Sequence, residues 1–85
     1  MDERAAFSRQ WAEEYARGCI WAYAWGEGSL NWVIGTLRLA MRWGSFTLGD
    51  VEAFIHDAER VISDPVALKR LEELRRRLPE LISVR

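Results

Sequence analysis

Apolar residues recur every three or four positions along most of the chain, which is the period of an α-helix with one side against a core. Such repeats cover residues 3–25, 29–43, 48–62 and 65–78, and a short C-terminal turn follows the last of them. The pattern predicts an all-α fold in which four mostly antiparallel helices form one domain over residues 1–85.

Residues typical of helix ends stand at the borders of these segments. They are Gly26 and Gly28, Ser29, Gly44, Thr47 with Asp50, Asp64 with Pro65, and Pro79. Ser29 and Asp64 are expected to accept hydrogen bonds from free N–H groups at helix starts, and Thr47 with Asp50 to form a capping box. Gly44 is expected to take the left-handed conformation that ends the second helix.

The segment 29–43 carries two apolar faces, so it is expected to be the central helix, covered on both sides. One face is the regular core stripe, formed by Leu30, Val33, Ile34, Leu37, Ala40 and Met41. The opposite face carries Trp32, Leu39 and Trp43. Only a narrow polar strip, made of Asn31, Arg38 and Arg42, separates the two.

The other helices each have one main apolar stripe. In the first helix the stripe holds Phe7, Trp11, Gly18, Ala22 and Trp25, with Tyr15 and Trp21 at its margins, while Ile20 and Ala24 point elsewhere. In the third it holds Leu48, Val51, Phe54, Ile55, Ala58, Val61 and Ile62, and in the fourth Ala67, Leu71, Leu74, Leu78, Leu81 and Ile82. We expect these stripes to face the core.

The composition describes a globular chain with no strong electrostatic field. Its 85 residues are 49% hydrophobic and 29% charged, with a formal net charge of −1, so nothing draws it globally to nucleic acid or anionic lipid. Cys19 is the only cysteine, which excludes an intrachain disulfide and suits a small buried hydrophobe. The sequence shows neither a secretory leader nor an apolar run long enough to span a membrane, so the expected location is the cytoplasm.

Residues suited to catalysis are few. Glu52, His56 and Glu59 share one helix face and could offer three metal ligands, but a solvated polar face explains them as well. No nucleophile is spaced to meet a histidine, and no glycine loop is built to hold phosphate. We therefore expect no enzymatic activity, no metal and no cofactor.

A helix-turn-helix DNA-binding regulator is one alternative function. Leu39, Ala40, Trp43 and Gly44 match the first half of that motif. The second half does not fit, because Asp50 stands where a buried apolar residue belongs. Carboxylates at the start of the would-be recognition helix would repel phosphates, which disfavours nucleic acid as a partner.

The five tryptophans favour a protein-interaction module. A domain of this size cannot easily enclose all of these large rings together with its aliphatic stripes, and tryptophan and arginine dominate binding energetics at interfaces. The predicted partner-binding residues are Trp21, Trp25, Trp32, Leu39, Trp43, Arg38 and Arg42. The expected partner is a second copy of the chain, another protein, or both, as for an assembly subunit, adaptor or small inhibitor. A small-ligand binder with a tryptophan-lined pocket is the remaining alternative.

Overall fold

The computed structural model describes the backbone of residues 3–82 and the side chains of residues 9–82. Its elements are α1 (Glu3–Ala24), α2 (Leu30–Gly44), α3 (Leu48–Val61), α4 (Pro65–Arg76) and the short 3₁₀ helix η1 (Leu78–Leu81). The prediction of four helices without strands is confirmed over this range, and the predicted boundaries differ by no more than two residues. None of these helices is both long and apolar enough to cross a membrane.

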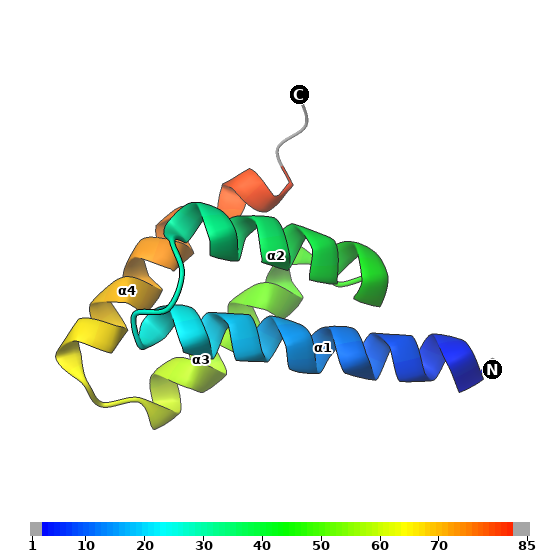
Figure 1. The fold of residues 1–85 in the computed structure, drawn as a ribbon, viewed down its shortest axis with the longest axis horizontal. Coiled ribbons are helices and arrows are strands. Elements are labelled where there is room, and N and C mark those ends of the chain that lie inside the picture. The colour runs from blue at the N-terminus through cyan, green and yellow to red at the C-terminus, as the bar shows by residue number, and fades with distance from the viewer. Residues whose placement is uncertain (1–2, 83–85) are drawn as a thin grey trace.

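The helices form two layers. Figure 1 shows α1 and α2 running antiparallel in front, with α3 and α4 crossing behind them. The core lies between the layers, and its largest fully buried side chains are Ile20, Leu37, Ile55, Leu71, Leu74, Val33 and Val51.

The expectation that residues 29–43 form the central helix is wrong. It is α1 that comes close to α2, α3 and α4 along its backbone, whereas α2 lies chiefly against α1 and η1. The reason is the small side chains on the inner side of α1, such as Ala12 and Ala16, which let neighbouring backbones approach.

The predicted inner stripe of α1 is also wrong for the residues whose side chains are described. The buried side is formed by Ala12, Ala16, Cys19, Ile20, Tyr23 and Ala24, while Trp11, Gly18 and Trp25 face outward. Both stripes have helical period, but the small residues permit closer packing than the rings do. Cys19 is buried, as predicted. Phe7 lies outside the described side chains.

The two faces of α2 are confirmed. Val33, Ile34, Leu37 and Ala40 are buried, and Leu30 and Met41 pack partly against the core. The end of this helix differs from the prediction, because Ser45, rather than Gly44, takes the left-handed conformation at φ 55°. Gly44 is the last helical residue and is buried under the Phe46 ring, which fills the space a Cβ would need.

The predicted N-caps are confirmed. The Ser29 hydroxyl accepts from Trp32 N–H at 3.0 Å, and the Asp64 carboxylate accepts from Ala67 N–H at 2.9 Å. Thr47 and Asp50 form the capping box. The hydrogen bond from the Thr47 backbone N–H lowers the pKa of Asp50, which keeps this carboxylate ionised.

After α2, two further residues predicted for the core, Val61 and Ile82, are exposed instead. Val61 points to solvent because the next residue, Ile62, turns extended and takes the buried position. Ile82 is exposed because the chain after α4 winds as a 3₁₀ helix, whose tighter turn shifts the face that an α-helical period would predict.

Candidate protein-interaction site

All five tryptophans lie at the surface of the α1–α2 layer. Their exposed fractions run from 42% for Trp32 to 51% for Trp25, so each indole is half covered by its own domain and half open. Together with Tyr15 and Leu39 they form a surface that we call the aromatic face. Its members are Trp11, Tyr15, Trp25, Trp32, Leu39 and Trp43, with Trp21 at its edge.

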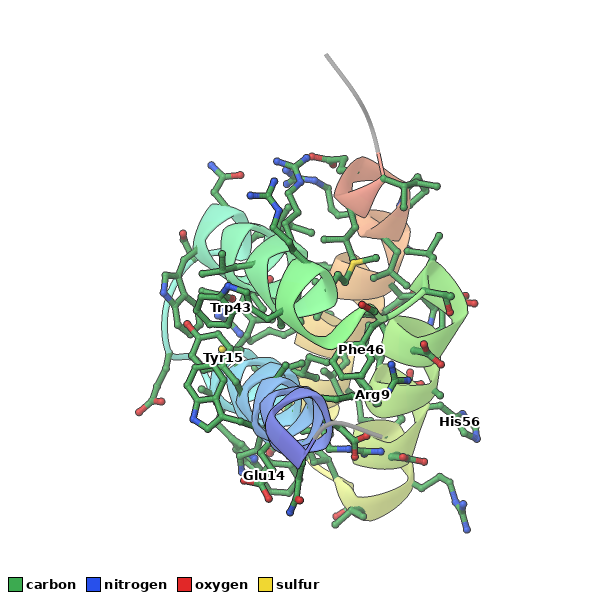
Figure 2. The ribbon with its side chains drawn as sticks, turned by 90° about the vertical axis from the view of Figure 1, so that its right-hand side faces the viewer. Arg9, Glu14, Tyr15, Trp43, Phe46 and His56 are labelled. Atoms are coloured by element: carbon green, nitrogen blue, oxygen red, sulfur yellow. The ribbon has the colours of Figure 1, made fainter. Side chains whose placement is uncertain are left out.

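Three rings from the two helices pack together at one end of the aromatic face. Trp11 stacks on Tyr15 with 5.3 Å between ring centroids, and Trp43 from α2 lies 5.2 Å from Trp11 and 6.3 Å from Tyr15. Figure 2 shows Tyr15 and Trp43 side by side, on the side of the molecule away from α3. The mutual contacts fix these rings in place, so a partner would meet an ordered surface.

The other end of the face is built around the loop between α1 and α2. Trp21 and Trp25 lie 6.2 Å apart at the end of α1. The Trp32 ring packs directly on Gly28, whose φ of 74° and missing side chain allow that approach. This end is therefore also held by local contacts.

The loop beneath is anchored from the other layer by Arg70 of α4. Its guanidinium donates to the carbonyl oxygens of Tyr23 at 2.6 Å and Gly28 at 3.3 Å, and it lies 4.2 Å from the centroid of the Tyr23 ring. This role could not be predicted from the sequence, since nothing local to Arg70 indicates a contact with residues more than 40 positions away.

Arg9 anchors the opposite end of the layer in a similar way. It donates to the Gly44 carbonyl oxygen at 2.7 Å and lies 4.9 Å from the centroid of the Phe46 ring. Figure 2 shows Arg9 beside Phe46, away from the Tyr15 and Trp43 rings.

The two arginines predicted for the site have different surroundings. Arg38 donates to the Glu80 carbonyl oxygen and so holds η1 against α2. Arg42 is exposed, and its guanidinium makes no hydrogen bond or ion pair with the described part of the chain. Only Arg42 is thus available to a partner at the border of the aromatic face.

The aromatic face itself carries little charge. Burial and the neighbouring Cys19 thiol raise the pKa of Tyr15, so its hydroxyl stays neutral over the physiological range. Glu14, which precedes Tyr15 on α1, is exposed and makes no hydrogen bond or ion pair within residues 9–82. Neither Glu14 nor Tyr15 was among the predicted partner-binding residues, although Tyr15 stands at the margin of the predicted stripe, one helical turn after Trp11.

Three other sites were considered from the sequence: a metal site on α3, a ligand pocket lined by tryptophan, and a DNA-binding helix. His56 is exposed on α3, and residues 9–82 contain no group of three or more His, Cys, Asp or Glu side chains placed to hold a metal ion. A hollow of about 280 Å³ is lined by Asp57, Arg60 and Val61, with no tryptophan. The start of α3 presents the capping carboxylate of Asp50 and the exposed Glu52, which is unfavourable for a DNA backbone.

Comparisons with family models, with curated proteins and with solved structures each gave no match to this chain.

Proposed function

We propose that this chain is a non-enzymatic protein-interaction module that binds its partner through the aromatic face. The observation that carries the proposal is the half exposure of all five tryptophans, which are presented by α1, α2 and the loop between them. Scattered apolar residues on a surface need no explanation, but here the rings gather in groups, with Trp11, Tyr15 and Trp43 in one and Trp21 and Trp25 in another. Apolar surface gathered in this way is typical of interaction sites.

The arrangement of the rings supports this role. Trp11, Tyr15 and Trp43 hold one another in place, so little side-chain freedom would be lost on binding. Indole rings that bury their remaining surface against a partner are the usual centres of binding energy.

The titratable groups support a role without catalysis. The groups with a shifted pKa are engaged in structural contacts, among them Asp50 in its capping box and Arg17 in its ion pair with Asp57 of α3. Catalytic sites instead gather such groups in a cleft. An assembly subunit, an adaptor or a small inhibitor would each fit this description.

Photocrosslinking in an extract of the source cells tests the proposal. A photoreactive residue in place of Leu39 should form a protein adduct. The same photoreactive residue in place of Glu52 on α3 is the matched control and should not. Excess unlabelled parent chain should compete the adduct away, and the Trp11→Gln/Trp43→Gln variant should not. Equal competition by both chains would show that binding does not use the aromatic face.

A further inference from the structure

We propose that the occupant of the aromatic face is a second copy of this chain, in a two-fold dimer that places Glu14 of each copy opposite Arg42 of the other. This inference rests on the proposed function and names the partner of the same surface. It follows from the charges at the borders of the face and from the area that the face offers.

The two borders of the aromatic face carry opposite charges. Glu14 lies on the side of α1 away from α2, as Figure 2 shows. Arg42 stands one helical turn after Arg38, which bonds η1 along the edge of α2. Residues four apart share a side of a helix, so Arg42 lies on the α2 edge away from α1.

Both charged residues lie at the same level along the two helices. The contacts of Trp43 with Trp11 and Tyr15 fix that level. Glu14 stands between Trp11 and Tyr15 in the sequence, and Arg42 immediately precedes Trp43. An acidic and a basic side chain therefore border the same three-ring cluster on opposite edges.

A two-fold axis parallel to the helices makes this arrangement complementary to itself. Such an axis lays α1 of one copy over α2 of the other. Because the rotation does not shift residues along the helices, each residue keeps its level. Glu14 then meets Arg42 of the other copy, and Arg42 meets the other Glu14. An axis across the helices would instead lay α1 over α1 and bring the two acidic borders to the same side.

The exposed aromatic surface is large enough for a dimer. At roughly 250 Å² for a whole tryptophan side chain, the upper end of the usual range, the exposed fractions of the five tryptophans leave about 570 Å² open per copy. Two copies whose rings are fully covered would thus bury about 1,100 Å² from tryptophan alone, which reaches the roughly 1,000 Å² expected of a biological interface. The net charge of −1 adds almost no repulsion between copies.

Charge reversal tests the pairing by analytical ultracentrifugation. The single variants Glu14→Arg and Arg42→Glu should each weaken dimerisation about tenfold, because two ion pairs per dimer become two repulsive contacts. Glu52→Arg and Arg60→Glu make the same changes in net charge at exposed positions on α3 and should leave the dissociation constant within about twofold of the parent.

Mixing the variants gives the sharper result. Chains carrying Glu14→Arg combined with chains carrying Arg42→Glu should form heterodimers preferentially, because both contacts are then attractive. The double variant Glu14→Arg/Arg42→Glu should restore homodimers to near the parent affinity. Damage to folding would not give this rescue, because the effects of two destabilising substitutions would add instead of cancelling.

Two results would overturn the inference. A parent chain that stays monomeric excludes the second copy as occupant, and the photocrosslinking experiment then decides the proposed function independently. A parent dimer that responds equally to the α1–α2 and α3 reversals excludes the Glu14–Arg42 pairing. If the Trp11→Gln/Trp43→Gln variant weakens that dimer, the aromatic face stands as a binding surface. If it does not, the dimer forms through another surface and this inference fails, while the photocrosslinking experiment still decides the proposed function.

Discussion

Gly44 and Gly35 stand in the same helix and have opposite surroundings. A Cβ at Gly44 would collide with the Phe46 ring, which is buried, lies beside Arg9 and meets Phe54 edge-on at 5.3 Å. A Cβ at Gly35 would have nothing within 4 Å. The same substitution should therefore have opposite effects at the two positions.

Gly44→Ala should lower the free energy of unfolding by about 1–2 kcal/mol, because overpacking outweighs the better helix propensity of alanine. Gly35→Ala should raise it by about 0.5–1 kcal/mol, since only the propensity changes. Urea denaturation of both variants measures the difference. A stabilised Gly44→Ala chain would mean that the Phe46 ring does not cover this glycine.

Asp64 begins α4 through its side chain. Asp64→Ala should cost about 0.5–2 kcal/mol, because the Ala67 N–H loses its acceptor at the start of the helix. Asp64→Ser is the matched control and should retain most of the stability, since serine caps equally well. Thermal melts followed by circular dichroism compare the variants. An alanine variant that melts with the parent would contradict the capping role.

At the scale of the helices, the boundaries could be predicted because their signals are local. The Ser29, Thr47 and Asp64 caps need only the next three residues, which the sequence supplies directly. Bonds between distant residues could not be predicted in this way. Arg38 holds η1 and Arg70 holds the α1–α2 loop through backbone carbonyls more than 40 positions away.

The orientation of α1 could not be predicted because two of its sides have helical period. Hydrophobicity favours the tryptophan side, while close packing favours the side with Ala12 and Ala16. Only the neighbouring helices decide between them. This error concerns the candidate site directly, since Trp11 and Trp25 of the predicted core stripe, and Tyr15 at its margin, belong to the aromatic face. In α2, by contrast, the sequence predicts a second apolar face with Trp32, Leu39 and Trp43, and these three side chains are exposed opposite the core stripe.

Arg70 ties the α1–α2 loop to α4, and its planar fork suits the two carbonyl acceptors. Arg70→Lys should cost about 1–2 kcal/mol, because an ammonium group cannot reproduce both bonds together with the contact on the Tyr23 ring. Arg76→Lys is the matched control on the same helix. Its exposed ion pair with Glu72 should contribute less than about 0.5 kcal/mol. Equal losses in urea denaturation would contradict the anchoring role.

At the scale of the whole molecule, the α1–α2 layer has one side against the core and one side toward solvent. The inner side of α1 and α2 closes the core against α3 and α4, and the outer side carries the aromatic face, whose Tyr15 and Trp43 are labelled in Figure 2. A chain of 85 residues has a stability of about 4–13 kcal/mol, so it can tolerate the loss of two half-exposed rings but not of two core rings. Whether the chain stays folded after two rings are removed therefore shows whether those rings belong to a surface or to the core.

The most direct measurement of the central claim is the solution mass of the parent and of the Trp11→Gln/Trp43→Gln variant, with circular dichroism of both. The parent should sediment at twice its chain mass of 9.9 kDa. The variant should keep its helical spectrum and raise the dimer dissociation constant at least about thirtyfold, as expected for the loss of interface hot spots. A variant that unfolds would place these rings in the core, and a folded variant that associates as tightly as the parent would show that the dimer does not form through the aromatic face.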